Sequence, residues 1–313
     1  MPPRAPAVTV KGRRMKSLPR RPTLTSHHDP VARRRVVVGM SVAALLASGA
    51  SFANGAGAAA PRHSGAVEVL YAGSLLDLMQ RTIEPAFHHA TGYSVVGIAN
   101  GSTALANEIK GGTEVADVFI SASPSVNNTL EGTTNGNWIT GYREFGRSPL
   151  LLAYNPASRF ARSLRTEPWY DVVDEPGFLL GRTDPAIDPK GVLAVDALTG
   201  VALSYDRPTL GALATSTSNV FTETSLVGEL EAGQLDAGFF YGVEASAAHL
   251  STVVLEGTGL HATYTAALVN RSPHPSAARA FLAFLLSPAG RTLLRGHGIA
   301  PIVPATMVAS TGG

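Results

Sequence analysis

Short apolar runs alternate with amphipathic segments along most of this chain, from about residue 67 to the carboxyl end. Apolar runs that predict buried strands lie at residues 67–71, 94–98, 116–120, 149–154, 178–181, 237–241, 253–255 and 263–269. Between them, apolar residues recur at helical spacing, which predicts helices at 75–91 (with a bend at Pro85), 103–110, 169–173, 193–203, 224–232, 277–286 and 289–296. This alternation is typical of α/β proteins.

The first 65 residues have a different pattern. The arginines 33–35 precede an apolar run at 36–47, and Ser51 and Ala53 then occupy the −3 and −1 positions of a cleavage site. This order is typical of a secretory signal, and the run is shorter than the ~20 apolar residues that a membrane span needs. We therefore expect a signal peptide and basic leader at 1–53, cleaved near Ala53, a linker at 54–65, and a periplasmic location.

The composition and the charge of the chain exclude several classes of function. Of the 313 residues, 45% are hydrophobic and none is cysteine, so a sizeable core is possible while disulfides, thiolate metal sites and thiol nucleophiles are excluded. The pI of about 9.0 reflects the leader. Residues 1–53 hold 10 basic residues and 1 acidic residue, whereas the rest of the chain holds 15 basic and 22 acidic residues, a net charge of −7. We therefore expect no nucleic-acid partner.

Two predicted strand-to-helix turns carry the same dipeptide, Gly73-Ser74 and Gly101-Ser102. In each turn the glycine lets the backbone approach a ligand, and the serine lies where unpaired helical N–H groups and a hydroxyl favour an anion. The alternative is that each serine only caps its helix. Because consecutive strand–helix units of a parallel sheet open on the same edge, the two turns together predict an anion site.

Three further residues are candidates, although each has a structural interpretation. Asp188 lies in an Asp-Pro turn, Glu223 stands at the start of a predicted helix, and Tyr241 ends an apolar strand. The motifs HExxH, GxSxG and GxxxxGK[ST] do not occur. We therefore expect no enzyme activity and no cofactor.

Seven short motifs occur in an order that resembles the molybdate/tungstate-binding proteins of ABC importers: VLYAGSL, GSTAL, ADVFISAS, LLLAYNPAS, GRTDPAIDPKG, LEAGQLDAGFFY and AFLAFLLSPAGRTLLRGHGIAPIVPA. The resemblance covers about residues 67–306. It implies a type II periplasmic-binding fold, in which two α/β lobes joined by crossing strands enclose the ligand cleft. The crossings would fall near 149–154 and 263–269, with lobe 1 at 66–148 plus 261–313 and lobe 2 at 149–260.

The resemblance also implies a ligand and a partner. Ser74 and Ser102 would donate to the oxygens of molybdate or tungstate, while Asp188 and Glu223 would bind its metal centre near Tyr241. Molybdenum and tungsten can expand from four to six ligands, so these carboxylates would favour them and repel sulfate. A monomer would deliver the anion to an ABC permease in the inner membrane. The alternatives are that the same fold binds sulfate or another oxyanion, serves as a sensor subunit, or carries an enzyme.

Overall fold

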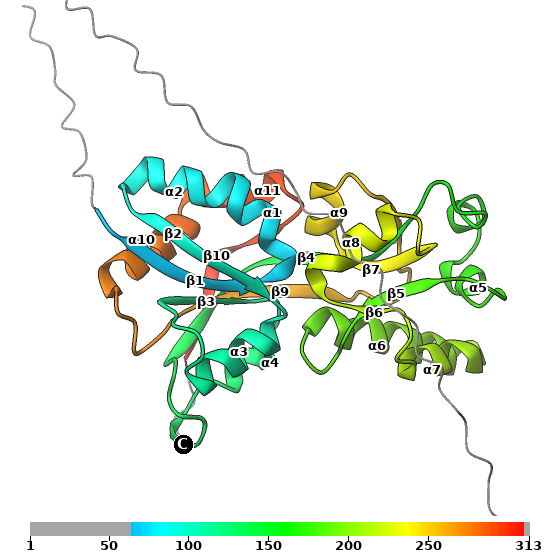
Figure 1. Cartoon of the computed structure of the whole chain (residues 1–313), viewed down its shortest axis with the longest axis horizontal. Coiled ribbons are helices and arrows are strands. Elements are labelled where there is room, and N and C mark those ends of the chain that lie inside the picture. The colour runs from blue at the N-terminus through cyan, green and yellow to red at the C-terminus, as the bar shows by residue number, and fades with distance from the viewer. Residues whose placement is uncertain (1–63, 310–313) are drawn as a thin grey trace, which may run out of the picture. The chain divides into compact units, whose positions relative to one another are not determined.

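The strands of the protein form one mixed sheet that two lobes share (Figure 1). The computed structural model describes residues 64–309, which fall within one compact unit at 56–313. The strands are β1 Ala66–Ala72, β2 Ser94–Asn100, β3 Val118–Ser121, β4 Gly141–Tyr154, β5 Leu180–Thr183, β6 Val220–Phe221, β7 Ala237–Tyr241, β8 Ser251–Val254, β9 His261–Leu268 and β10 Ala300–Ala309. Their order is β2-β1-β3-β9-β4-β7-β5-β6, and β8 and β10 both pair with β4.

The helices pack on both faces of this sheet. They are α1 Leu76–Leu78, α2 Glu84–Thr91, α3 Ser102–Gly111, α4 Pro124–Asn128, α5 Trp169–Val173, α6 Pro189–Ser204, α7 Pro208–Thr215, α8 Glu223–Glu231, α9 Gly242–Ala247, α10 Pro275–Leu285 and α11 Pro288–Gly296. The mixed α/β organisation expected from the sequence is confirmed. The expected signal peptide, cleavage site and most of the linker lie outside the described residues. Within 64–309, no helix combines the length and the apolar composition of a membrane span.

The first lobe is built on the parallel strands β2, β1 and β3, followed by antiparallel β9 and the first half of β4. Successive side chains of a strand point to opposite faces. On β1, Val69 and Tyr71 therefore pack with Phe87 of α2 and Phe281 of α10, while Leu70 packs with Leu105 of α3 on the other face. Figure 1 shows the same division of helices above and below the sheet.

The second lobe follows the same rule around β7, which pairs antiparallel with β4 and parallel with β5. Phe239 packs on the side of α6 with Leu198, whereas Phe240 packs on the side of α8 with Leu226. In both lobes the parallel strands end on loops that start a helix. The residues at these loops are those that the sequence singled out as candidates.

One continuous strand, β4, passes from the first lobe to the second. Its residues 143–149 pair with β9, and its residues 150–154 pair with β7. The chain returns through residues 255–260, between β8 and β9. Among the described residues β9 pairs with β3 and β4, and the second crossing expected near 263–269 overlaps this strand.

The helix expected at 75–91 is irregular. A 3-10 turn at Gly73–Leu75, α1 and a π-helical turn at Met79–Ile83 precede α2. The sequence predicts a bend at Pro85. The structure has this π-helical turn there, which ends at Ile83, directly before the first residue of α2, Glu84. Proline has no N–H to give to the preceding turn, so the irregularity falls on its amino-terminal side.

Candidate functional site

The five residues singled out from the sequence lie at the ends of elements in both lobes. In the first lobe, Ser74 lies in the 3-10 turn after β1, and Ser102 begins α3. In the second lobe, Asp188 precedes α6, Glu223 begins α8, and Tyr241 ends β7. Each of the five is at most 5% exposed. The five side chains are therefore almost completely shielded from solvent.

The two Gly-Ser loops face the second lobe at very short range. A Cβ on Gly73 would lie 2.7 Å from Oε2 of Glu223, and a Cβ on Gly101 would lie 3.2 Å from Cβ of Asp188. The amide of Ala104 also donates a hydrogen bond of 3.2 Å to the carbonyl of Ile187 across the cleft. The structure thus brings the Ser74 loop to Glu223 and the Ser102 loop to Asp188.

Neither serine caps its helix, so the alternative interpretation of these residues as N-caps is wrong. The hydroxyl of Ser74 lies 2.9 Å from the hydroxyl of Tyr264. The hydroxyl oxygen of Ser102 accepts a hydrogen bond of 3.1 Å from the amide of Ala122. Because the oxygen of Ser102 accepts, its own hydrogen is free for a further acceptor such as an anion, whereas either hydroxyl of the Ser74–Tyr264 pair can be the donor.

The groups of the second lobe are buried without full hydrogen bonding. Oδ1 of Asp188 caps α6 by accepting from the amide of Lys190 at 3.0 Å, but its Oδ2 has no hydrogen-bond partner among the described residues. The same holds for both carboxylate oxygens of Glu223 and for the hydroxyl of Tyr241. Thr222, one residue earlier, provides the cap of α8 instead. Because buried polar groups are rarely left unpaired, these atoms are candidates for contact with a ligand.

Two residues of the site were not among the sequence candidates. Lys190 is fully buried, and its ammonium lies 2.6 Å from Oε1 of Glu244 and 3.6 Å from Oε1 of Glu223. Oε2 of Glu244 accepts a hydrogen bond of 2.9 Å from the amide of Tyr241. A glutamate three residues after a strand-end residue has the spacing of a capping box, and this signal in the sequence points to Glu244.

The cluster has strong electrostatic effects on its own members. Burial raises the pKa of Glu223 well above its usual range, and the nearby charge of Asp188 raises it further. Burial likewise raises the pKa of Asp188 and, together with the charge of Asp188, that of Tyr241. Burial alone would lower the pKa of Lys190, but Glu244, Glu223 and Asp188 outweigh it, so the pKa is raised and the ammonium stays charged.

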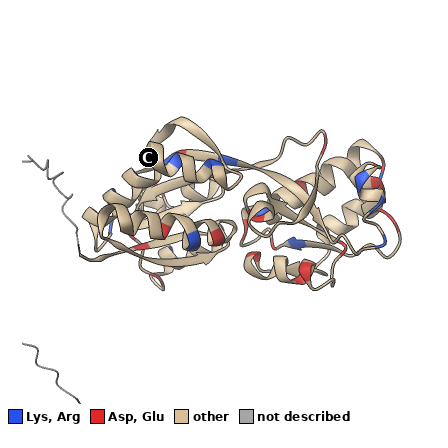
Figure 2. Cartoon of the chain, turned by 90° about the horizontal axis from the view of Figure 1, so that it is seen from above, with Lys and Arg blue, Asp and Glu red and all other residues tan. Residues whose placement is uncertain are grey.

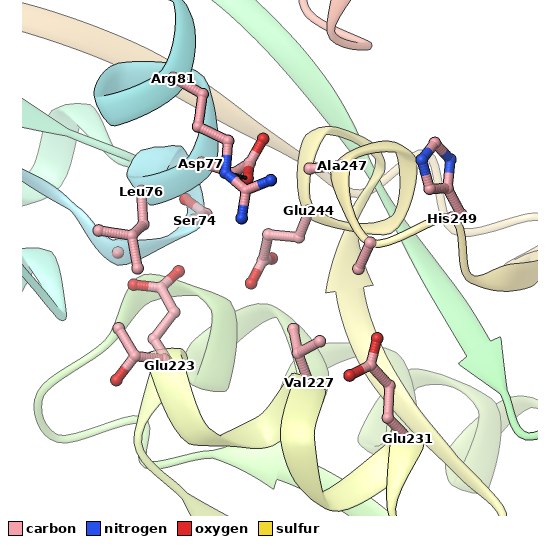
Figure 3. A pocket seen from close by; sticks show the side chains of 13 residues that line it. Ser74, Leu76, Asp77, Arg81, Glu223, Val227, Glu231, Glu244, Ala247 and His249 are labelled. Atoms are coloured by element: carbon pink, nitrogen blue, oxygen red, sulfur yellow. Dashed lines mark ion pairs between the residues drawn. The ribbon is translucent and has the colours of Figure 1, made fainter. Parts of the chain in front are cut away.

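A cavity of about 450 Å³ opens beside this cluster, between the two lobes (Figure 3). Ser74 lines it from the first lobe, and the carboxylates of Glu223 and Glu244 point into it from the second. Its outer part is lined by the ion pair of Arg81 and Asp77, whose atoms lie 2.8 Å apart. Ser102 and Asp188 are not among its lining residues. The cavity therefore reaches one side of the candidate site.

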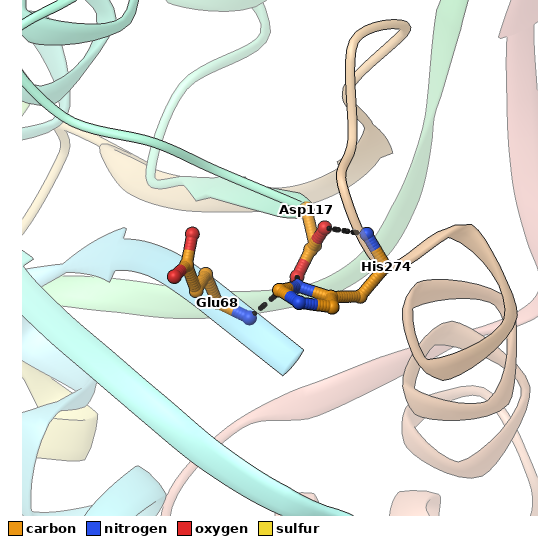
Figure 4. Close-up of side chains that lie close together, drawn as sticks. All are labelled: Glu68, Asp117 and His274. Atoms are coloured by element: carbon orange, nitrogen blue, oxygen red, sulfur yellow. Dashed lines mark hydrogen bonds and ion pairs between the residues drawn. The ribbon is translucent and has the colours of Figure 1, made fainter. Parts of the chain in front are cut away.

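A second acidic cluster lies in the first lobe, away from this cavity (Figure 4). It contains Glu68, Asp117 and His274, and its potential ligand atoms lie within 4.8 Å of one another. The carboxylate of Asp117 accepts four hydrogen bonds, from the amides of Glu68 and His274, the ring of His274 and the hydroxyl of Ser272. Four donors occupy the lone pairs of a carboxylate, so this cluster holds strands and a helix start together.

In Figure 2 the ribbon positions of basic and acidic residues are interspersed in both lobes. Residues 54–313 hold 15 basic and 22 acidic residues, so this part of the chain has no excess of positive charge. The site thus depends on local donors rather than on a long-range positive field.

Comparison with known sequences identifies the family. The profile of the bacterial extracellular solute-binding proteins matches residues 67–300. An uncharacterized solute-binding protein of Halobacterium salinarum is 28% identical over 87% of this chain and 93% of its own length. A putative ABC transporter molybdenum-binding protein of Haloferax volcanii is 31% identical over 56% of this chain and 54% of its own. The molybdate/tungstate-binding protein WtpA of Pyrococcus abyssi is 23% identical over 51% of this chain and 61% of its own.

Comparison with solved structures identifies the fold. The periplasmic molybdate-binding protein of Azotobacter vinelandii superimposes with a TM-score of 0.61 at 16% identity, over 75% of this chain and 98% of its own. The sulfate-binding protein SubI of Mycobacterium tuberculosis superimposes with a TM-score of 0.56 at 17% identity, over 77% of this chain and 88% of its own. The expected type II periplasmic-binding fold is confirmed, as is the resemblance to the molybdate/tungstate-binding proteins.

Proposed function

Because the chain belongs to the family of bacterial extracellular solute-binding proteins, we propose that it binds molybdate or tungstate for an ABC importer. It would capture the anion in the periplasm as a monomer and deliver it to a membrane permease. The observation that carries this proposal is that Oδ2 of Asp188 and both carboxylate oxygens of Glu223 are buried without a hydrogen-bond partner among the described residues, while these two side chains face the two Gly-Ser loops. Solute-binding proteins are not enzymes, and we propose no catalytic step and no cofactor.

The chemistry of the two halves of the cleft supports this ligand. Ser74 and Ser102 would donate their hydroxyl hydrogens to the oxygens of the anion, since the oxygen of Ser102 has another partner and Tyr264 can donate to that of Ser74. Oδ2 of Asp188 and one oxygen of Glu223 would bind molybdenum or tungsten, which accept hard oxygen ligands beyond the four of the free anion. Sulfur in sulfate does not expand in this way, so the carboxylates would repel sulfate.

Sulfate or another four-coordinate oxyanion is the second candidate. It is supported by the raised pKa values of Glu223 and Asp188, because a protonated carboxyl group donates a hydrogen bond to an anion instead of repelling it. The fold of SubI shows that sulfate-binding proteins share this architecture. A role as a ligand-binding sensor subunit would use the same site and differ only in the partner.

A calorimetric titration of the mature protein with tungstate, molybdate, sulfate and phosphate separates these candidates. We expect tungstate or molybdate to bind at least about 100-fold more tightly than sulfate, equivalent to about 2.7 kcal/mol. Sulfate binding as tight as tungstate binding would contradict the proposed ligand. Capture of the protein by detergent-solubilised permease from the same operon, in the presence of ligand, would distinguish the transport role from the sensor role.

A further inference from the structure

Lys190 is a buried cation. The roles proposed for the two serines and the two carboxylates of the site do not explain its presence there. It lies in the first turn of α6, two residues after Asp188, and its side chain is 0% exposed. A charge in such a place is strongly disfavoured unless its partners are close and well oriented. The groups that surround Lys190 therefore indicate its role in the site.

The ammonium of Lys190 joins elements of the second lobe that are far apart in the sequence. It contacts Glu244 of α9 at 2.6 Å and Glu223 of α8 at 3.6 Å. It also lies over the rings of Phe240 and Tyr241 at the end of β7, at 5.4 and 5.8 Å from their centroids. Through Glu244, which accepts from the amide of Tyr241, the same network fixes the start of α9. Lys190 thus connects three helices to one strand end.

The two oxygens of Glu223 have different surroundings because of this network. Oε1 faces the ammonium of Lys190, whereas Oε2 faces Gly73 of the first lobe, 2.7 Å from the position of an added Cβ. Neither oxygen has a hydrogen-bond partner among the described residues. The carboxylate is therefore oriented by an ion pair on one side and presents its other oxygen across the cleft.

From this geometry we propose that Lys190, held by Glu244, is a positioning residue that orients Glu223 as a single-oxygen ligand to the anion's central atom. The inference rests on the proposed function, since it assigns a task within the same site. The positive charge of Lys190 compensates Glu223 and the incoming anion at close range. Lys190 forms an ion pair with Glu223, so its removal would take away one constraint on the orientation of this carboxylate.

The test removes both members of the closest ion pair, Lys190 and Glu244, at the same time. The double variant K190M/E244Q replaces both members with neutral side chains of similar length, which is the change that buried ion pairs tolerate best. We expect it to bind tungstate about 10- to 100-fold more weakly than the parent, as is typical when a residue that orients a metal ligand is lost. X-ray absorption of the bound tungsten should show fewer oxygen ligands than in the parent.

Two further variants test whether a loss of tungstate affinity is due to Lys190. E244Q alone keeps the ammonium but removes the carboxylate that holds it, so its tungstate affinity should lie between those of the parent and the double variant. R207M removes an ion pair with Asp171 and Asp174 whose residues do not line the cavity, and it should change neither affinity nor coordination. If the double variant does not fold, K190Q, which retains a donor for Glu244, is measured in its place with the same expectation.

The outcomes separate this inference from the function on which it rests. If the parent binds tungstate, an unchanged affinity and coordination number in the folded variant overturns the role of Lys190. If the parent binds sulfate in preference, the proposed ligand is wrong. Because sulfur does not accept a carboxylate as an added ligand, that outcome also overturns Glu223 as a ligand to the central atom, whereas tungstate binding with an unaffected variant overturns the role of Lys190 alone.

Discussion

Two buried acidic clusters, one around Asp117 and one around Glu223, show how similar residues serve different purposes in this protein. Asp117 is 0% exposed and accepts four hydrogen bonds, which outweigh the effect of burial and lower its pKa. Glu223 is 5% exposed and has no hydrogen-bond partner among the described residues, and burial raises its pKa. Burial alone therefore does not identify a carboxylate that binds a ligand.

The difference lies in where each carboxylate is placed. Asp117 precedes β3 and faces backbone amides of its own lobe, so the folded chain satisfies it permanently. Glu223 faces the opposite lobe and a cavity, and its contact with Lys190 at 3.6 Å leaves its oxygens without a hydrogen bond that meets the usual geometry. A buried carboxylate without hydrogen-bond donors lowers the stability of the ligand-free protein. A ligand that pairs with this carboxylate removes the cost, and the free energy gained strengthens binding.

The largest effect is expected where the satisfied cluster is broken. The variant D117N turns an acceptor into a donor facing the amides of Glu68 and His274, and we expect it to lower the free energy of unfolding by about 3 kcal/mol. Chemical denaturation measures this change. D171N, which removes a half-exposed ion pair with Arg207, should cost about 1 kcal/mol or less. A D117N protein as stable as the parent would contradict the structural role of this carboxylate.

The next effect is expected in the unsatisfied cluster, and on binding rather than folding. E223Q and D188N each remove a ligand oxygen with its charge, so tungstate affinity should fall about 100-fold, while any residual sulfate affinity falls less. Calorimetry with both anions gives the ratio. D117N serves as the control, because it should bind tungstate like the parent. Equal losses for both anions would assign Asp188 and Glu223 a purely structural role.

A smaller effect is expected from a methyl group placed between the lobes. G101A would bring a Cβ into overlap with the carbonyl oxygen of Ile187, which is backbone and cannot rotate away. We expect tungstate affinity to fall about 10-fold, or 1.4 kcal/mol, and the radius of gyration of the liganded protein to increase in small-angle scattering. G200A, whose added Cβ meets nothing within 4 Å, is the matched control. Parent-like affinity in G101A would show that the lobes bind without this contact.

The smallest effect is expected in the pH dependence of the empty protein, where the two clusters should act in opposite directions. Glu223 has a raised pKa when folded, so its contribution to stability is present below its unfolded pKa of about 4.3 and is lost as pH rises toward the folded value. Asp117 has a lowered pKa, so its contribution is present above about 3.9 and is lost as pH falls through the folded value.

Thermal melts of ligand-free parent, E223Q and D117N between pH 3 and 8 would measure this contrast. The stability of E223Q relative to the parent should increase with rising pH, and the deficit of D117N should shrink at acid pH. Each pKa unit corresponds to about 1.4 kcal/mol. A parent and an E223Q variant with parallel pH profiles would contradict the raised pKa of Glu223.

The strands of the core could be predicted from the sequence because their apolar runs are local signals. The run at 237–241 coincides with β7, and those at 67–71 and 94–98 lie within β1 and β2. By contrast, β10 carries Pro301 and Pro304 and is mostly exposed, and its pairing with β4 depends on tertiary contacts. Its existence has no local signature that distinguishes it from a loop.

The candidate site was predictable only in part for a similar reason. Ser74 and Ser102 share a dipeptide after a strand, and this repetition is visible in the chain. The contact of Lys190 with Glu244 joins residues 54 positions apart, and that of Ser74 with Tyr264 joins residues 190 apart. Such pairs form through the packing of α6, α9 and β9, which periodicity does not encode.

Because β4 passes through both lobes, it sets one of the positions at which they could bend relative to each other. Within residues 64–309, β4 and residues 255–260 are the segments that connect the lobes. Pro149, where the partner of β4 changes from β9 to β7, has no amide hydrogen, so a bend at this position would break no hydrogen bond donated by that residue. We expect an anion that bridges the serines to the carboxylates to favour the closed arrangement of the lobes, with the change in backbone angle falling at this point of β4.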